Sequence, residues 1–582
     1  MQTSILTLPR DAWRLARPFF RSDERWPAYF KLAAIVVLNL SMVGMDVVLN
    51  FWNRAFYNSL QSKDWDSFTS LLLSWKRTEH GFMPGFTGIA FLYIFVAVYR
   101  TYLNQWLQID WRRWMTTHMV QDWLADRAYY RIALASAGGA GDTNDNPDQR
   151  IAEDLRDFVA STLALALDLL SNVVTLFSFI FILWTLSGPV TLLGITIPGF
   201  MVWAALAYAV VGTWLTHLIG RKLVLLSFRQ QRVEADFRFS LVRLRENMEG
   251  VALYAGEARE QQGLGRLFME VRDNWWAIMQ RTKLLNALVA GYGQVSVIFP
   301  IVVAAPRYFA GTLDLGGLTQ TAGAFGSVQG AMSWFVTSYR ELASYRATID
   351  RLTLFRDAID TARSGKGGVT DSVTEGTDQH LEGLEISLPN GDVLIDIDDL
   401  VLQQGQSVAL QGRSGSGKST LFRALAGIWP FAKGHVTRGQ GSRLFLPQRP
   451  YFPLGTLRVA VSYPEDPKRF TDAEIVTALI LAGLEHLVGE ISHVDSWGTR
   501  LSGGEQQRLA MARALLIKPD WLFMDEATSS LDAASEAELL GKLRMVLSQT
   551  TFVSITHRDT VAAQAQKRYR LEGGKLVSDG VN

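Results

Sequence analysis

The sequence predicts two domains of different class, an α-helical domain that crosses a membrane and an α/β domain with a phosphate-binding loop. Six apolar runs of spanning length lie before residue 340. The octet Gly412–Ser419 fits the pattern G-x-x-x-x-G-K-[ST]. A stretch rich in Gly, Ser, Thr and Asp separates the two parts. We therefore expect an interfacial N-terminal helix, a six-helix membrane domain, a linker and a P-loop nucleotide-binding domain, over 1–28, 29–357, 358–380 and 381–582.

The apolar runs predict six membrane-spanning helices, because each is close to the roughly 20 residues that a helix needs to cross the hydrocarbon core. The third and fourth runs are joined by the short turn Ser187-Gly-Pro189. The fifth and sixth are joined by the short turn 310–314. The expected spans are Tyr29–Asn50, Phe86–Trp106, Ser161–Leu186, Val190–Leu215, Leu284–Phe309 and Leu315–Tyr339.

The distribution of Lys and Arg predicts that both termini lie in the cytoplasm. Segment 104–158 carries six arginines, and segment 212–286 carries twelve Lys and Arg, whereas both short turns carry none. Positive charge accumulates on the cytoplasmic side of membrane proteins. The first outer loop, with four basic residues over 51–85, is a mild exception. The two long inner segments are expected to be helical hairpins that project from the membrane.

Composition excludes several other classes of protein. The formal net charge of +1 gives no basic excess for nucleic acid, and the absence of Cys excludes disulfides and thiolate chemistry. Five arginines lie between Arg10 and Arg25 without an apolar core and cleavage site, so this is no cleavable signal peptide. With Trp13 and neighbouring Phe residues, the segment is typical of a cytoplasmic surface helix near the membrane interface.

The ionisable residues inside the expected spans include Asp46, Arg100 and Asp168. Charges in a bilayer are unfavourable unless they face water or a partner. Asp46 and Asp168 could line a polar cavity that attracts cationic peptides. Alternatively they form an intramembrane ion pair with Arg100, or the span boundaries lie several residues away.

The phosphate-loop octet follows an apolar strand pattern, 406–410, and precedes a helix pattern, 421–426. Glycines let the backbone wrap round phosphates, so that N–H groups and a helix N-terminus face the negative charge. Lys418 is expected to reach the β- and γ-phosphates, and Ser419 to complete the Mg²⁺ shell. The expected nucleotide-contacting residues of this loop are Gly412, Ser414, Gly415, Ser416, Gly417, Lys418, Ser419 and Thr420.

Further motifs follow in a fixed order. Gln448 lies in Leu446-Pro-Gln-Arg-Pro450, and Leu501-Ser-Gly-Gly-Glu-Gln-Gln-Arg508 comes later. The apolar strand pattern 521–524 ends in Asp525 and Glu526, and Asp532 and His557 complete the series. This order resembles the ATP-binding-cassette family over residues 381–575, and the six spans with long inner hairpins resemble its exporter-type half-transporters.

The resemblance implies a role for each motif. Asp525 would hold Mg²⁺ together with Ser419 and Gln448, Glu526 would act as general base on the attacking water, and His557 would orient water and γ-phosphate. Ser502, Gly503 and Gly504 would bind the γ-phosphate of ATP held by a second copy, with Asp532 nearby. The expected cofactors are therefore ATP and Mg²⁺, and the expected partner is an identical chain. By itself, His557 also fits an ordinary histidine at a strand end.

The sequence departs from the family at the adenine site. Family members place an aromatic ring on adenine some tens of residues before the phosphate loop, but no Phe, Trp or Tyr occurs between Phe355 and Phe422. We expect adenine to rest on apolar side chains near Leu388 and Pro389, or on groups elsewhere, with weaker base selectivity.

Shorter segments indicate a branch of the family. Asn146-Pro-Asp-Gln-Arg150, Glu234–Arg238 and Tyr254–Glu257 resemble peroxisomal-type (subfamily D) half-transporters, and residues 446–457 resemble bacterial relatives. An ordinary polar hairpin also explains Asn146-Pro147. The overall pattern is similar to BacA-like transporters, which are related to the peptide importer SbmA, although SbmA-type proteins lack a cassette. We expect one of the two inner hairpins to contact the cassette.

This resemblance implies a homodimeric ATPase of the bacterial inner membrane that imports peptides and contacts membrane lipids. Two alternatives stay open for the substrate: export of lipid, acyl or drug-like compounds, and import of cobalamin. A third alternative is a membrane-anchored regulatory ATPase that transports nothing.

Overall fold

The computed structural model describes residues 7–78, 81–137, 146–188, 190–192, 195–364, 370–373 and 376–578. It divides into two compact units, each described by itself. The membrane unit comprises residues 1–120 and 146–355, and the nucleotide unit comprises 121–145 and 356–582. The expected fold class, a helical membrane domain joined to an α/β P-loop domain, is confirmed. The turn of the first inner hairpin nevertheless belongs to the nucleotide unit.

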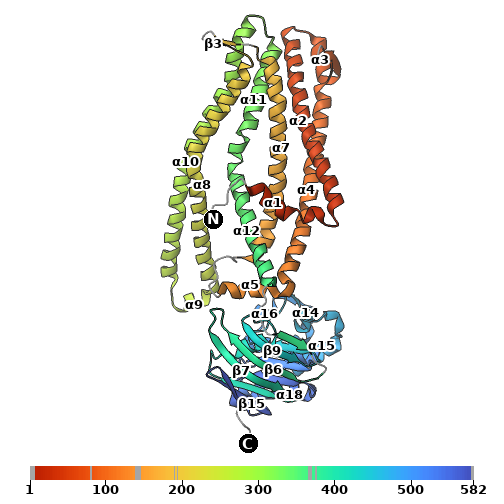
Figure 1. Ribbon diagram of the computed structural model, residues 1–582, viewed down its shortest axis with the longest axis vertical. Coiled ribbons are helices and arrows are strands. Elements are labelled where there is room, and N and C mark those ends of the chain that lie inside the picture. The colour runs from red at the N-terminus through yellow and green to blue at the C-terminus, as the bar shows by residue number, and fades with distance from the viewer. Residues whose placement is uncertain are drawn as a thin grey trace. The chain divides into compact units, whose positions relative to one another are not determined.

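Long helices form the membrane unit (Figure 1). Within the described residues, five helices are long and apolar enough to cross a membrane. They are α2 (Arg25–Gln61), α4 (Phe86–Leu124), α7 (Leu155–Leu186), α8 (Phe200–Glu246) and α10 (Glu257–Phe309). Their exposed faces carry large apolar side chains, as expected of helices that face lipid: Phe91, Phe95, Phe177, Phe181, Val210 and Val302.

The sixth expected span is a helix, α11 (Leu315–Thr337), but it is not among the five described helices that are long and apolar enough to cross a membrane. It packs against α2, α7, α8 and α10. Its residues Gln320, Phe325 and Val328 are fully buried. A helix enclosed by protein does not need a lipid-compatible surface, which explains the Gly, Gln and Thr residues that lower its hydropathy.

The fourth span begins later than expected. Residues from Val190 form the short antiparallel hairpin β3 (Val190–Leu192) and β4 (Ile195–Ile197), and α8 starts only at Phe200. The cause is local. Five of the six strand residues are β-branched, which favours strands, and Gly199, at φ 64°, turns the chain into the helix. Pro189 of the predicted turn lies outside the described residues.

Shorter elements complete the membrane unit. The N-terminal helix α1 (Leu8–Ala16) precedes a 3₁₀ turn, Phe19–Arg21, and residues 1–6 of the expected N-terminal helix lie outside the described residues. The first outer loop holds α3 (Trp65–Leu73) and the hairpin of β1 (Trp75–Thr78) and β2 (Gly81–Pro84). The two long hairpins between the spans add α6 (Pro147–Gln149), a π-helical segment Arg150–Asp154, and α9 (Met248–Leu253).

The nucleotide unit is built on a six-stranded sheet with the order β10-β13-β14-β8-β15-β16. Four neighbouring strands, β10, β13, β14 and β8, are parallel, so their carboxyl ends meet at one edge. The sheet packs against α13 (Lys418–Leu425) in an apolar core that includes Leu410, Phe422 and Phe523. The strands are β8 (Val408–Gly412), β10 (Arg443–Leu446), β13 (Trp521–Asp525), β14 (Thr551–Ile555), β15 (Lys567–Glu572) and β16 (Lys575–Ser578).

The nucleotide unit contains a second sheet, with the strand order β5-β9-β6-β7. Its strands are β5 (Thr370–Val373), β6 (Gln379–Ser387), β7 (Val393–Leu402) and β9 (Ala432–Arg438). The sequence predicts a linker over residues 358–380. In the structure, α12 (Tyr339–Ser364) occupies this segment as far as Ser364, and β5 within it pairs with β9. Linker residues 365–369 and 374–375 lie outside the described residues.

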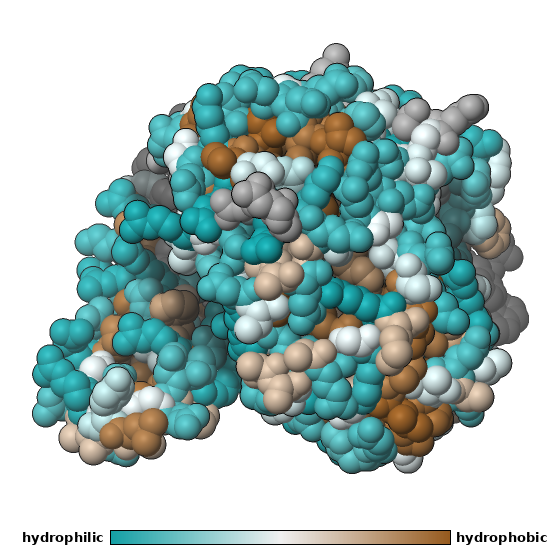
Figure 2. Space-filling model, turned by 90° about the horizontal axis from the view of Figure 1, so that it is seen from below, coloured by the Kyte–Doolittle hydropathy of each residue, from teal (hydrophilic) through white to brown (hydrophobic). Residues whose placement is uncertain are grey.

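A second apolar core contains the helix residues Leu479, Trp497 and Leu509 together with Leu446 of β10 and Leu522 of β13. The view from below shows a largely hydrophilic face with small, separate apolar patches (Figure 2). The remaining elements are α5 (Ala128–Ala137), α14 (Leu457–Ser462), α15 (Asp472–Leu481), α16 (Trp497–Arg500), α17 (Gly503–Ile517), α18 (Ala533–Val546), α19 (Asp559–Ala562), β11 (Gly455–Thr456) and β12 (Val494–Asp495).

Candidate nucleotide site

The phosphate-loop residues lie where β8 ends and α13 begins. Gly412, Gly415 and Gly417 have positive φ angles of 153°, 79° and 102°, the conformations that glycine adopts most readily. Close packing also requires two of them. A Cβ on Gly412 would lie 2.9 Å from the Leu571 carbonyl oxygen, and one on Gly417 would lie 2.7 Å from the Leu394 side chain. The loop therefore keeps its backbone exposed beside the N-terminus of α13.

The loop contains polar groups that suit a phosphate. The Ser416 hydroxyl is buried and has no hydrogen-bond partner in the described structure. A Cβ placed on Gly415 would meet no atom within 4 Å, so the space beside it is open. Ser414 is exposed on the loop, and Thr420 is buried in α13. An unpaired hydroxyl beside open space and a helix N-terminus is the donor set that binds a polyphosphate.

Lys418 and Ser419 connect this loop to β13. The Lys418 Nζ donates to the carbonyl oxygens of Gly412 and Arg413 at 2.9 and 2.8 Å. The Ser419 hydroxyl donates to Asp525 Oδ1 at 3.0 Å. Burial lowers the pKa of Lys418 and raises the pKa of Asp525. The buried ammonium of Lys418 and the buried carboxylate of Asp525 are therefore only partly stabilised by their present neighbours. A phosphate beside the ammonium and a cation beside the carboxylate would each be favourable.

Glu526 lies one residue beyond β13 and is held by two side chains from neighbouring strand ends. Gln448 Nε2 donates to Glu526 Oε2 at 3.1 Å, and His557 Nε2 lies 2.9 Å from Glu526 Oε1. Glu526 also has a left-handed backbone, with φ 47°. Such strain in a non-glycine residue persists only where its surroundings impose it, and it concentrates at functional sites.

The parallel sheet explains why these residues meet. Gln448 follows β10, Glu526 follows β13, His557 follows β14 and the phosphate loop follows β8. These are four adjacent strands, and their carboxyl ends share one edge. Oxygen donors from Ser419, Gln448 and Asp525 suit Mg²⁺. The described residues contain no group of three His, Cys, Asp or Glu that could hold a metal, so phosphate and water would complete the ion's shell.

Ser502, Gly503 and Gly504 form the N-terminus of α17. Ser502 and Glu505 make a reciprocal capping box, in which Glu505 Oε2 accepts from the Ser502 N–H at 2.9 Å. The Ser502 hydroxyl holds the pKa of Glu505 below its ordinary value. Ser502 and Gly503 are exposed. Among the hydrogen bonds of the described residues, none joins these three residues to the phosphate loop of the same chain.

Asp532 caps α18 and accepts from the backbone N–H groups of Ala534 and Ser535 at 3.1 and 2.9 Å. Gln507, which sequence reasoning missed, is a buried residue of α17 that bonds the segment before Asp532. Its Nε2 donates to Ser529 Oγ at 3.2 Å, and its Oε1 accepts from Ser530 N–H at 2.8 Å. Its position after the Ser-Gly-Gly motif was the available signal, but burial of a Gln cannot be read from sequence.

Arg513 is a second residue that sequence reasoning missed. It is buried on α17, and its guanidinium donates to the carbonyl oxygens of Tyr451 and Ala460 at 3.0 and 2.7 Å. It also lies over the rings of Phe452 and Tyr463, at 5.1 and 5.5 Å. Burial lowers the pKa of Arg513 to about 10. The side chain thus fastens α17 to the segment that follows Gln448.

The first inner hairpin contacts the cassette within the nucleotide unit. Arg127, just before α5, donates to the carbonyl oxygens of Ala426 and Gly427 at 3.1 Å each, where α13 ends. Asp126 and Arg127 both have left-handed backbones, with φ 51° and 57°. The contact that we expected of one inner hairpin is therefore made by this one. It connects a segment between two spans to the helix that starts at the phosphate loop.

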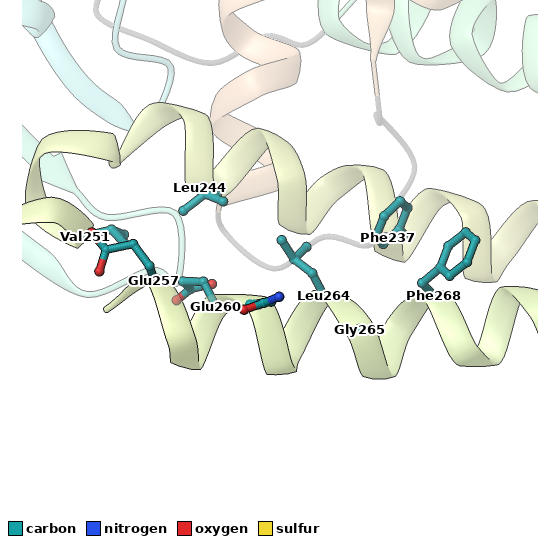
Figure 3. Close-up of a pocket in the computed structure, with 9 residues that line it drawn as sticks. Phe237, Leu244, Val251, Glu257, Glu260, Leu264, Gly265 and Phe268 are labelled. Atoms are coloured by element: carbon teal, nitrogen blue, oxygen red, sulfur yellow. The ribbon is translucent and has the colours of Figure 1, made fainter. Parts of the chain in front are cut away.

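The second inner hairpin contains a separate groove of about 450 Å³ between α8 and α10 (Figure 3). The rings of Phe237 and Phe268 close one end at 5.7 Å between centroids. Leu244, Leu264 and Val251 continue the lining toward α9. Because both arms of one hairpin supply the lining, this groove belongs to the membrane unit and is not a nucleotide site.

The ionisable residues of the spans are not paired with one another in the described structure. Arg100 donates to Asn39 Oδ1 at 2.9 Å, and Asn39 bonds the Leu167 carbonyl oxygen in turn. Asp46 and Asp168 are exposed on α2 and α7, and no ion pair to Arg100 is found. The intramembrane ion pair, one of two sequence alternatives, is therefore not the arrangement observed.

The predicted adenine-contacting residues lie in the tight turn between β6 and β7. Leu388 N–H donates to the Asp392 carbonyl oxygen at 2.8 Å, and Gly391 N–H donates back to Leu388 at 2.9 Å. Leu388 and Pro389 are half-buried. In the next strand, Leu394 contacts the phosphate loop at Gly417. This side of the loop therefore offers aliphatic surface in place of an aromatic ring.

Both parts of the chain match known families. Residues 15–309 match the family described as "ABC transporter transmembrane region 2", and residues 395–529 match "ABC transporter". An uncharacterised ABC transporter ATP-binding protein of Haemophilus influenzae is 36% identical over 92% of this chain and 88% of its own length. ABC transporter D family member 2, chloroplastic, of Arabidopsis thaliana is 32% identical over 96% and 85%. The human lysosomal cobalamin transporter ABCD4 is 28% identical over 84% and 86%.

A solved structure supports the same fold. The ATP-bound structure of a bacterial Atm1-family ABC exporter superposes with a TM-score of 0.73 at 18% identity, over 94% of each chain. At this identity the likeness concerns fold alone. Three observations agree: the two family matches, the relatives that span most of the chain, and the geometry of the phosphate loop. The chain is a multi-pass half-transporter with subfamily D homologues that couples ATP hydrolysis to transport, and it belongs to the ABC transporter family.

Proposed function

We propose that two copies of this chain form an importer of peptides in the bacterial inner membrane, driven by MgATP and related to the BacA-like group. The observation that carries the peptide assignment is the pair of carboxylates, Asp46 and Asp168, on spanning helices. Each is exposed, and neither has a recorded hydrogen bond or ion pair through its carboxylate in the described residues. Unpaired carboxylates at such a depth are unfavourable unless they face water or a cationic solute.

In the nucleotide site, each residue would act from the position that it already occupies. Lys418 would exchange its two carbonyl partners for the β- and γ-phosphates, and the loop N–H groups would surround them. Ser419, Asp525 and Gln448 would hold Mg²⁺, which neutralises developing charge on the phosphates. Glu526 would orient water and take its proton, with His557 and Gln448 holding the carboxylate in place.

The exposed N-terminus of α17 supports a dimer. Ser502, Gly503 and Gly504 present N–H groups and the positive end of a helix dipole, yet have no recorded bond to their own phosphate loop. They would contact the γ-phosphate bound by the second copy. Two ATP molecules would then lie between two nucleotide units. Hydrolysis of this ATP, with Glu526 as the general base, would release the two units from each other.

The contact of Arg127 with the end of α13 supports coupling to the membrane unit. Movement of α13 on nucleotide binding would displace the hairpin turn directly. A chain whose ATPase is thus connected to its spans is better explained as a transporter than as a regulatory ATPase. Liposomes that contain only the purified protein distinguish the two, because a regulatory ATPase would move no solute there.

A second candidate is translocation of lipid or acyl compounds. This candidate is favoured by an apolar groove of about 630 Å³ beside α8 and α10, and not by the carboxylates Asp46 and Asp168. Six of its lining residues are Ile197, Phe200, Trp203, Tyr208, Val211 and Phe299. Import of cobalamin is a third candidate, supported by the name of the ABCD4 relative.

The deciding experiment measures uptake of a labelled cationic peptide in cells that lack their own importer. Wild-type protein should give ATP-dependent uptake, and the Glu526→Gln variant should give none. Equal uptake in both would contradict ATP-driven import of that peptide. If neither transports it, substrate-stimulated ATPase with acyl compounds and with cobalamin would identify which alternative replaces the peptide.

A further inference from the structure

The N-terminal helix α1 has two unlike faces. Leu8, Ala12, Leu15 and Ala16 are buried in an apolar core shared with α2, α4, α7 and α12. The opposite face is exposed and continues through the first residues of α2. It carries Arg10, Trp13, Arg14, Arg17, Arg21, Arg25 and Trp26, here called the arginine face.

The packing of α1 places the arginine face at the end of the spans. Its core partners on α4 are Leu107, Trp111 and Met115, which directly follow the predicted span ending at Trp106. On α2, the predicted span starts at Tyr29, a few residues after Arg25. The level at which hydrocarbon ends is the level of lipid headgroups.

Exposed aromatic rings support the same depth. Trp13, Trp26 and Phe30 are 53%, 72% and 79% exposed. Trp residues concentrate where hydrocarbon meets headgroups, because the ring is apolar and its N–H is polar. Surface rings of this size beside arginines are typical of a segment that lies in the membrane interface.

The charges on this face are incompletely paired. In the part of the chain that the structure describes, no ion pair is found for Arg10, Arg17, Arg21 or Arg25. Two nearby carboxylates form ion pairs with other arginines: Asp11 pairs with Arg346, and Glu24 pairs with Arg113. The face therefore presents several guanidinium groups toward the headgroup region.

We propose that the arginine face binds anionic phospholipid headgroups of the cytoplasmic leaflet and that this binding regulates ATP hydrolysis. The planar guanidinium forms paired hydrogen bonds with phosphate. Basic segments beside spans are attracted to anionic leaflets. The inference rests on the proposed cytoplasmic location of α1 and on the ATPase activity of the family.

A direct connection links the N-terminal segment that carries the arginine face to α12. Arg346 on α12 donates to Asp11 Oδ2 at 2.6 Å and to Thr7 Oγ1 at 3.1 Å, and also pairs with Asp350. The hydrogen bond from Arg346 holds the pKa of Asp11 below its ordinary value. The chain passes from the membrane unit into the nucleotide unit within α12. A lipid that fixes α1 therefore also restrains the helix that leads to the cassette.

The test uses the full-length protein and two matched variants with four fewer positive charges. The first changes Arg10, Arg17, Arg21 and Arg25 to Gln. The control changes four exposed basic residues of the nucleotide unit to Gln: Lys433, Lys468, Arg469 and Lys575. Binding of a fluorescent short-chain phosphatidylglycerol to detergent-purified protein is measured against the same probe with a phosphatidylcholine headgroup.

We expect the first variant to bind the anionic probe at least about tenfold more weakly than wild type, since each basic residue near an anionic surface contributes appreciably. The control should bind as wild type does. Equal binding by all three proteins would overturn the proposal. Displacement of the probe by glycerol phosphate at equal concentration would also overturn it, because the site would then recognise a free phosphate and not a membrane lipid.

Regulation is tested in nanodiscs of phosphatidylcholine with or without phosphatidylglycerol. ATP hydrolysis by wild type and control should change with phosphatidylglycerol, while the first variant should not respond. Asp11→Asn should keep probe binding but lose the response, because its link to Arg346 is weakened. A full response in the first variant would contradict the proposal. Loss of hydrolysis by wild type in both lipids would instead contradict the ATPase assignment, and the binding assay would still decide lipid recognition.

Discussion

The nucleotide site and the membrane spans hold their carboxylates in opposite ways. At the nucleotide site, Asp525 accepts from Ser419 at 3.0 Å, and Glu526 is held by Gln448 and His557. In the spans, the carboxylates of Asp46 and Asp168 form no hydrogen bond or ion pair among the described residues. The first arrangement is preorganised for one reaction.

The difference indicates where specificity resides. A fixed carboxylate with two partners serves a single geometry, that of water attacking a phosphate. Unpartnered carboxylates in a membrane impose little geometry and select mainly by charge, which suits solutes of varied sequence such as peptides. Substitutions on each side of this contrast test it.

The largest effect is expected for Glu526→Gln. Loss of the general base should lower ATP hydrolysis at least about 100-fold while ATP binding persists, because the phosphate loop is untouched. Steady-state hydrolysis and binding of a labelled ATP analogue check this. Glu465→Gln, which removes only an exposed partner of Arg469, is the control and should hydrolyse normally. Undiminished hydrolysis by Glu526→Gln would contradict the base assignment.

Arg513→Met should give the next largest effect. It leaves two carbonyl groups without their donor, and each buried unsatisfied group is destabilising. If Arg513 positions α17, kcat for ATP should fall about tenfold, and KM should stay within about twofold.

Two matched variants separate positioning from general stability. Arg513→Lys keeps the charge and should recover part of kcat. Arg508→Met removes one guanidinium contact from the same helix, to the Ala482 carbonyl at 3.2 Å, and should change kcat little. Parallel changes in kcat for Arg513→Met and Arg508→Met, with equal falls in Tm, would indicate a structural role only.

Asp46→Asn and Asp168→Asn test the other side of the contrast. We expect each to lower uptake of a cationic peptide about fivefold, since a single charge contact in a partly hydrated site contributes on the order of 1 kcal/mol. Uptake of a neutral peptide and hydrolysis of ATP should not change. Asp66→Asn, in the outer loop, is the control. Normal uptake of the cationic peptide by both variants, at normal expression, would remove these residues from the substrate path.

The smallest effect concerns the base of the nucleotide. With aliphatic Leu394 beside the loop and no aromatic residue between Phe355 and Phe422, ATP and GTP should be hydrolysed with kcat/KM values within about tenfold of each other. Competition between the two nucleotides in one assay measures this ratio. A much larger preference for ATP would show that another group reads adenine.

The nucleotide site could be predicted largely from sequence because its chemistry depends on short segments. The glycines of 412–417 need positive φ angles that few other residues tolerate, and strand patterns place Asp525 and Glu526 at a strand end. Parallel strands then bring such ends together. What could not be predicted was burial: Gln507 and Arg513 appear as ordinary polar residues of a helix until the packing around them is known.

In the membrane unit too, some features follow from the sequence alone and others depend on how the helices pack. Long apolar runs determined its helices by themselves, because backbone in lipid must satisfy its hydrogen bonds within a helix. Only the tertiary structure decided that α11 is enclosed by four helices and so tolerates Gln320, or that Arg100 bonds Asn39 and leaves Asp168 without an ion pair. Spacing along a chain fixes which residues share a helix, but contacts between distant segments depend on how whole helices pack, which no local pattern encodes.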